Sequence, residues 1–208
     1  RLLEHPNHLL LVEKDPLLLP KIEKRLKSHP HARLINNDIL DFDFQEAIFF
    51  LEAPFALISN LPYHISTPFL ERIVDNHPLF TKIQLLLQKE VVDKVLTRSG
   101  PDVAKISILI DLFYNKGEGI PIPPKAFTPP PRVDSKFLTL TPKMPLLDPA
   151  ELPGFKNFIH TAFNHRKHTL HWLFKKLHLP VPTDSDRKIE DLSTPEWVNT
   201  YHFSLQNR

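Results

Sequence analysis

The tetrapeptide Asn60-Leu61-Pro62-Tyr63 places an amide, a proline turn and an aromatic ring side by side. The side-chain oxygen of Asn60 and the carbonyl oxygen of Leu61 are both hydrogen-bond acceptors. Two acceptors aimed at the N–H bonds of a planar amine would favour the tetrahedral nitrogen that attacks an electrophile. Tyr63 would stack on the ring that carries the amine, an interaction worth ~1–3 kcal/mol for a nucleobase. Taken alone, the motif also fits a structural role, in which Asn60 caps the next turn and Tyr63 fills a gap in the core.

The elements that must position this motif are short apolar runs that end in polar residues. Such runs occupy residues 9–13, 33–36 and 55–59, and each reads as a buried parallel strand. Glu13, Asp38 and Asn60 stand at or just beyond their ends. Because ligands of open parallel sheets bind beyond the carboxyl ends of the strands, these three residues predict a binding site at one edge of a sheet.

Helical spacing of apolar residues separates these strands. The spacing predicts helices over residues 16–28, 67–75, 90–97 and 105–114, and further strands over 83–88, 117–122 and 136–141. Alternation of strand and helix is typical of an α/β fold with helices packed on a sheet.

The C-terminal part of the chain differs in pattern. Residues 142–153 contain four prolines and read as a linker, and the pattern then becomes wholly helical. Residues 155–178 contain five Lys or Arg, five His and no Asp or Glu. At helical spacing, the apolar residues of this segment form a stripe that can pack against the rest of the protein. The basic residues fall on a second stripe that can meet phosphates: Lys156, His160, Lys167, His171 and Lys175. A solvated basic face is the alternative.

Composition narrows the class of protein. The 208 residues are 41% hydrophobic, enough for a folded core, and no apolar run reaches the roughly 20 residues of a membrane helix. Cysteine is absent, which excludes disulfides and thiolate metal sites within these residues. We expect a cytoplasmic protein with no metal and no membrane association. The only methionine is Met144, so we also expect the natural chain to begin before Arg1.

Four segments resemble motifs of one family. Residues 60–70 read NLPYHISTPFL, 85–96 read LLLQKEVVDKVL, 127–135 read FTPPPRVDS and 163–170 read FNHRKHTL. In this order they are similar to the catalytic motif, the LQKEVA segment, the FxPPPxVDS loop and the FxxRRKTL helix of the KsgA family of ribosomal RNA adenine dimethyltransferases. The similarity runs from about Leu9 to the end of the chain.

The resemblance implies an α/β fold with two domains. Residues 1–143 would form a Rossmann-like, S-adenosylmethionine-dependent methyltransferase domain, and residues 144–208 a small all-helical domain. The implied reaction methylates N6 of two adjacent adenosines, twice each, in the 3′-terminal hairpin of small-subunit ribosomal RNA. The implied partner is the assembling small subunit (pre-30S particle). The resemblance also implies that the enzyme acts as a monomer.

The resemblance also assigns the cofactor site. Glu13 matches the residue that binds both ribose hydroxyls of S-adenosylmethionine. Asp38 matches the acceptor for the cofactor's adenine amino group, with Ile39 beside the ring. Asn60 lies near the methionine part of the cofactor in this family.

Catalytic and RNA-binding roles follow in the same way. Asn60, Leu61, Pro62 and Tyr63 match the catalytic motif. Phe127 matches a second aromatic that would sandwich the target base with Tyr63. The implied phosphate contacts are Arg132, Arg166 and Lys167.

Two departures from the family pattern stand out. The family carries a first strand and a glycine-rich loop before the region that matches Leu9, and the strand lies beside the one ending at Glu13. Here all four glycines come much later, from Gly100 onward, so strand and loop are absent from these residues. His168 stands where the family usually has a third basic residue.

Two other functions remain open. A large-subunit ribosomal RNA methyltransferase of the antibiotic-resistance type shares the fold and the catalytic motif. An RNA-binding assembly or transcription factor could retain the fold without catalysis, although Asn60 and Tyr63 are both present.

Overall fold

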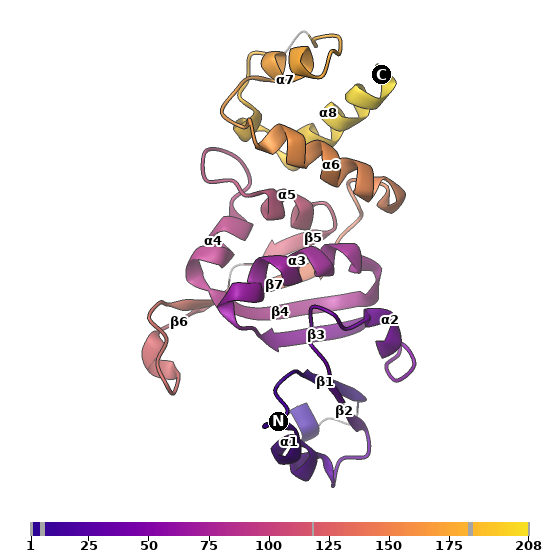
Figure 1. Ribbon diagram of the computed structural model, residues 1–208, viewed down its shortest axis with the longest axis vertical. Helices are drawn as coiled ribbons and strands as arrows, with labels where there is room; N and C mark the ends of the chain where they lie inside the picture. Colours follow the sequence, from indigo (N-terminus) through magenta and orange to yellow (C-terminus); the bar gives the residue numbers. More distant parts are fainter. Residues whose placement is uncertain (1, 5–6, 118, 183–184, 208) are drawn as a thin grey trace.

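A computed structural model describes residues 2–4, 7–117, 119–182 and 185–207 (Figure 1). The N-terminal unit is a small parallel sheet in which β1 (Leu9–Glu13) pairs with β2 (Ala32–Asn36) in register, Glu13 opposite Asn36. Helix α1 (Leu19–Leu26) connects the two strands. It begins three residues later than its apolar spacing predicted, and Pro20 lies in its first turn, where proline is tolerated.

Within the described residues, the main sheet has five strands. Its order is β3-β4-β7-β5, and β6 pairs with β7 beside that path. The bounds are β3 (Phe55–Asn60), β4 (Phe80–Gln88), β5 (Tyr114–Gly117), β6 (Pro121–Ile122) and β7 (Ser135–Pro142). Strands β3 and β4 are parallel, while β7 is antiparallel to β4, β5 and β6. The α/β class is confirmed, but the described residues form two sheets, because β1 and β3 share no ladder.

Helices are stacked above the main sheet (Figure 1). The nearer layer contains α3 (Ser66–Asp75), α4 (Lys89–Leu96) and α5 (Lys105–Asp111), and the farther layer α6 (Leu152–Phe163), α7 (Leu170–Lys176) and α8 (Thr194–Gln206). A short helix that sequence patterns missed, α2 (Phe44–Ala47), is capped by the Asp43 carboxylate, which accepts a hydrogen bond from the Gln45 amide.

One continuous core joins these layers. It includes Ile83, Leu85 and Leu87 of β4, all fully buried, and continues through α5 into Phe155 of α6. Each fully buried side chain of this size contributes ~1.5–3 kcal/mol. Because the core is shared, the domain boundary at residue 143 remains a prediction.

Two predicted elements differ in the structure. The helix predicted over 105–114 ends at Asp111, and Tyr114 begins β5, where burial raises the pKa of its hydroxyl. The prediction of a single strand over 117–122 was wrong, because the described residues of this segment belong to two strands, β5 and β6. Position 118 lies outside the described residues. Between them the chain passes so close to β7 that a Cβ on Gly119 would overlap the Phe137 carbonyl.

The basic segment 163–170 is a turn rather than a helix. α6 ends at Phe163, and α7 begins after Thr169, whose hydroxyl accepts a hydrogen bond from the Trp172 amide at 3.4 Å. Successive turn hydrogen bonds, His165 N–H to Ala162 O and His168 N–H to His165 O, redirect the chain. The expected single helical stripe is therefore divided between two helices. Among the described helices, none is long and apolar enough to cross a membrane.

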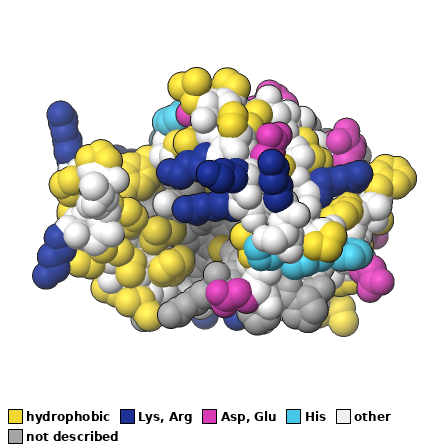
Figure 2. Space-filling model, turned by 90° about the horizontal axis from the view of Figure 1, so that it is seen from below, with side chains coloured by type: hydrophobic (Ala, Val, Ile, Leu, Met, Phe, Trp, Pro, Cys, Tyr) yellow, Lys and Arg dark blue, Asp and Glu magenta, His cyan; other side chains and the backbone are white. Residues whose placement is uncertain are grey.

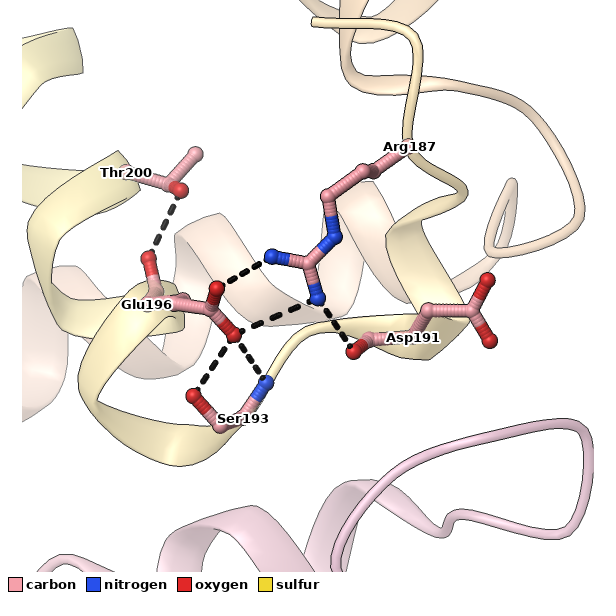
Figure 3. Close-up of polar contacts among 5 residues, drawn as sticks. All are labelled: Arg187, Asp191, Ser193, Glu196 and Thr200. Carbon is pink, nitrogen blue, oxygen red and sulfur yellow. Dashed lines mark hydrogen bonds and ion pairs between the residues drawn. The ribbon is translucent and has the colours of Figure 1, made fainter. Parts of the chain in front are cut away.

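The start of α8 is held by a charged network (Figure 3). The Glu196 carboxylate accepts hydrogen bonds from Arg187 and, at 2.8 and 2.6 Å, from the backbone and hydroxyl of Ser193. Arg187 also donates to the Asp191 carbonyl at 2.9 Å. Burial alone would raise the pKa of Glu196, but the hydrogen bonds from Arg187 and Ser193 outweigh it and lower the pKa to about 2.

Replacing this carboxylate will destabilise the C-terminal helices. Because the folded pKa of Glu196 lies below its ordinary value, the ionised group stabilises the fold above that value and the contribution is lost as pH falls toward about 2. We expect Glu196→Gln to lower the free energy of unfolding by about 1 kcal/mol at neutral pH, the usual worth of a cap. Urea unfolding should show this difference shrinking on acidification. Asp186→Asn, an exposed charge control, should show no such difference; an equal effect there would contradict the role of Glu196.

Candidate functional site

The tetrapeptide 60–63 lies where β3 ends. Asn60 pairs with Leu86 of β4 at the last position of the ladder and is exposed, while Leu61 is buried. Pro62, with φ −55° and ψ 135°, turns the chain out of the sheet into a short 3-10 helix, Tyr63–Ile65. The Ser66 hydroxyl donates to the Tyr63 carbonyl at 2.9 Å. This turn holds the backbone of the motif in one conformation.

The ring of Tyr63 is tethered to β7. Its hydroxyl lies 2.9 Å from the hydroxyl of Ser135, the buried first residue of that strand. The contact follows from the register, since β4 carries Leu86 opposite Asn60 and Gln88 opposite Ser135. The half-buried Phe127 belongs to the loop that leads into β7, so the tether joins the motif to the segment that carries the second predicted aromatic residue.

Glu13 and Asp38 lie together at the carboxyl ends of β1 and β2. One oxygen of Glu13 accepts a hydrogen bond from the Asp15 amide at 2.8 Å. The Asp38 carboxylate accepts one from the Leu40 amide at 2.9 Å and forms an ion pair of 2.6 Å with Lys14. This hydrogen bond from Lys14 is the main cause that holds the pKa of Asp38 below its ordinary value. Sequence patterns did not single out Lys14.

Asp38 lies within electrostatic reach of the turn that follows β3. The charge of His64, next to Tyr63, also lowers the pKa of Asp38, so the tetrapeptide and the carboxylate are within electrostatic reach of each other. Ile39, beside Asp38, is half-buried and packs against the core. The predicted polar residues therefore each lie at or just beyond the end of a strand, Glu13 and Asp38 in the two-stranded sheet and Asn60 in the main sheet.

A separate cleft lies near the C-terminal helices. Its volume is about 1040 Å³, and Arg132 and Arg166 both line it, although they are far apart in the sequence. The guanidinium of Arg166 lies 4.9 Å from the ring centre of Phe163, which also lines the cleft. Lys167, the third predicted phosphate contact, is exposed outside this lining. The cleft carries both signs of charge, with Lys89, Glu90, Asp93, Lys94, Asp102, Lys105 and Asp134 around it.

A basic surface on α1 was missed by the sequence patterns. Figure 2 shows the underside of the molecule, where Lys and Arg side chains gather next to a hollow bordered by hydrophobic side chains. Helix α1 lies at the lower end of the molecule in Figure 1 and so faces the viewer in Figure 2. The helix and the residue that follows it carry four exposed cations, Lys21, Lys24, Arg25 and Lys27. The spacing of these residues in PKIEKRLK could have revealed this face. Among the described residues no group of three His, Asp or Glu could hold a metal ion.

This arrangement of strands and helices defines a Rossmann-like methyltransferase fold. Two solved structures share it at low sequence identity: a dimethyladenosine transferase from Plasmodium falciparum (TM-score 0.76, 19% identity, covering 93% of this chain and 80% of that one) and the 23S rRNA methyltransferase ErmE (TM-score 0.66, 18% identity, covering 96% and 82%).

Sequence comparison gives the family. Residues 1–194 match the model of the ribosomal RNA adenine dimethylase family. The chain is 34% identical to the ribosomal RNA small subunit methyltransferase A of Geobacter sulfurreducens, covering 90% of this chain and 69% of that protein. It is 31% identical to the protein of the same name from Variovorax paradoxus, covering 95% and 77%. The chain therefore belongs to the ribosomal RNA adenine dimethylase family, whose methyl donor is S-adenosylmethionine.

The tether between Tyr63 and Ser135 can be measured without any activity. In a double-mutant cycle of Tyr63→Phe and Ser135→Ala, we expect a coupling of about 0.5–1.5 kcal/mol in the free energy of unfolding, because either change alone leaves a hydroxyl unpaired. A matched cycle of Tyr63→Phe with Ser28→Ala, an exposed serine after α1, should give no coupling. Additive effects of Tyr63 and Ser135 would show that the hydrogen bond is not formed.

Proposed function

We propose that this protein transfers methyl groups from S-adenosylmethionine to N6 of two adjacent adenosines in the 3′-terminal hairpin of small-subunit ribosomal RNA. The observation that carries the proposal is the tetrapeptide 60–63, fixed at the carboxyl end of β3 by the turn at Pro62 and by the hydrogen bond between Tyr63 and Ser135. The names of the curated relatives favour the small subunit over the large one as the site of the reaction.

Glu13, Asp38 and Ile39 would hold the cofactor. Glu13 uses one carboxylate oxygen for the Asp15 amide, and a carboxylate has further acceptor sites for ribose hydroxyls. Asp38 is ionised and partly exposed, which suits acceptance of a hydrogen bond from an amino group. Ile39 offers an apolar surface beside it. The bound cofactor supplies an electrophilic methyl group, and these residues determine where it lies.

Asn60 and Leu61 would activate the substrate amine. The lone pair of an adenine amino group is delocalised into the ring, so the amine is a poor nucleophile. Acceptors at Asn60 Oδ1 and the Leu61 carbonyl would hold its two N–H bonds and favour a tetrahedral nitrogen. The turn at Pro62 keeps these acceptors in place. Proton loss can follow methyl transfer, so this step requires no strong base.

Tyr63 and Phe127 would hold the target base between them. The base must leave its stack to enter such a site. The hydrogen bond to Ser135 fixes the Tyr63 ring before substrate arrives, which reduces the entropy lost on binding. Stacking against the two rings tolerates repeated reaction at the same nitrogen, because the contact is with the face of the base.

Arg132, Arg166 and Lys167 would contact RNA phosphates. Arg132 and Arg166 share the lining of the cleft and can meet one RNA backbone together, while Lys167 lies exposed beside it. Such contacts orient the RNA without reading its sequence. We further propose that the protein acts as a monomer in the cytoplasm on an assembling small subunit, with a catalytic domain over 1–143 and a helical domain over 144–208.

Asn60→Ala tests the proposed chemistry. Loss of one acceptor should lower the rate of methyl transfer about a hundredfold or more. The assay uses the natural full-length protein, labelled S-adenosylmethionine and unmethylated small ribosomal subunits, with dimethyladenine in the 3′ hairpin as the product. Asn115→Ala removes another exposed strand amide, on β5, and should retain full activity.

Other outcomes of this assay would change the proposal. If the wild-type protein binds subunits and transfers no label, the small-subunit methyltransferase function fails. Label on large-subunit RNA would then identify the alternative substrate. Binding without transfer to either RNA would leave an assembly factor.

Asp38→Asn tests the cofactor site. The amide places a donor toward Lys14 and toward the incoming amino group, so the affinity for S-adenosylmethionine should fall about tenfold or more, as expected for a lost hydrogen bond to a charged group. Calorimetric titration measures this change. Asp41→Asn removes an exposed negative charge from the same turn and should alter affinity less than about twofold. Equal effects of the two changes would assign the role to charge alone.

A further inference from the structure

Four side chains at the turn between α6 and α7 form a compact aromatic and cationic group. The ring of His168 stacks on Trp172, with centres 4.2 Å apart and an interplanar angle of 15°. His165 packs against the same indole at 4.6 Å. Lys176 Nζ lies 2.9 Å from His165 Nε2 and 4.9 Å from the centre of the Trp172 ring. We name this group, His165, His168, Trp172 and Lys176, the ring platform.

Trp172 packs partly against the core, and the rest of the platform lies at the surface. His168 and Lys176 are exposed, and His165 and Trp172 only half-buried. Partial burial lowers the pKa of His165, and the neighbouring charges of Lys176 and His168 act in the same direction. A neutral His165 ring can accept the hydrogen bond from Lys176, which directs the ammonium group over the indole.

The backbone beneath the platform is fixed. The amides of Ile189 and Glu190 donate to the carbonyls of His168 and Arg166 at 2.9 and 3.0 Å. The Leu170 amide donates to the Arg187 carbonyl at 3.0 Å. A turn that is held across a second segment presents its rings with little freedom left to lose on binding.

The surroundings favour an anionic partner. Residues 155–178 contain ten Lys, Arg or His side chains and no carboxylate. Arg166, between His165 and His168 in the sequence, also lines the cleft, so the platform continues the surface to which RNA phosphates are assigned above. Exposed rings flanked by cations are the combination that binds unpaired nucleotides, through base stacking and phosphate contacts together.

We propose that the ring platform binds an unpaired nucleotide of the RNA outside the catalytic pocket. The base stacks on the exposed face of His168, supported by Trp172 beneath, and Lys176 meets the adjoining phosphate. This inference rests on the proposed function, because it assumes an RNA that already occupies the cleft. The platform thereby favours an RNA in which a single-stranded segment lies next to the part that is bound in the cleft.

Binding of short RNAs tests the platform. The probes are a single-stranded oligoadenylate of about ten nucleotides and a blunt duplex of the same strand length. His168→Ala should weaken binding of the single strand about tenfold and change duplex binding less than twofold. His8→Ala removes an exposed histidine outside the C-terminal helices and should affect neither probe.

A comparison with the neighbouring Lys175 separates the role of Lys176 from a general effect of positive charge. Lys176→Ala and Lys175→Ala remove the same charge from α7, and Lys175 is exposed outside the platform. We expect the first change to weaken binding of the single strand several-fold more than the second. Tryptophan fluorescence should be quenched by the single strand and not by the duplex, since Trp197 is fully buried and Trp172 is not.

Two results would overturn the inference. One is a His168→Ala protein that binds oligoadenylate as tightly as wild type, and the other is an equal loss in the Lys175 and Lys176 variants. Methyl transfer to small subunits by the wild-type protein is measured in parallel. An active wild type with unchanged binding in His168→Ala rejects the platform alone, whereas an inactive wild type rejects the proposed function.

Discussion

The pairing of β4 with its two neighbours is the constraint on which the site depends. β4 is parallel to β3 on one side and antiparallel to β7 on the other, and its buried side chains fix it within the core. The two registers place Asn60 opposite Leu86 and Ser135 opposite Gln88. A shift of either ladder by one residue would exchange buried and exposed faces, so the register is strongly specified. The tether from Tyr63 to Ser135 follows directly from it.

Local patterns predicted most of the elements and the ends of the strands. β1, β2, β3 and β7 were located within one or two residues, because short apolar runs bounded by polar residues are strong local signals. Residues such as Glu13 and Asp38 were singled out for the same reason. The roles assigned to them came from the family resemblance and not from spacing.

Other features depend on contacts that no local pattern records. The end of α5 at Asp111 depends on Tyr114 pairing with Pro142, far along the chain. The turn at 164–169 depends on backbone hydrogen bonds to 187–190, and a basic run gives no sign of them. The ion pair of Lys14 with Asp38 joins the segments that follow two different strands. Each of these is a tertiary interaction, which overrides local propensity where the two conflict.

The separation of the two sheets has a consequence for handling the molecule. In the part of the chain that the structure describes, β3 pairs with β4 on one side only, and its residue Ile58 is 54% exposed. A row of unpaired backbone groups beside an apolar side chain is a template for strand addition, by another copy or by any extended peptide. The family resemblance implies a further strand at the centre of the sheet, beside β1. The segment that occupies the edge of β3 determines the distance between Glu13, at the end of β1, and Asn60, at the end of β3. That distance in turn determines how long a ligand can be if it is to lie between the ends of these two strands.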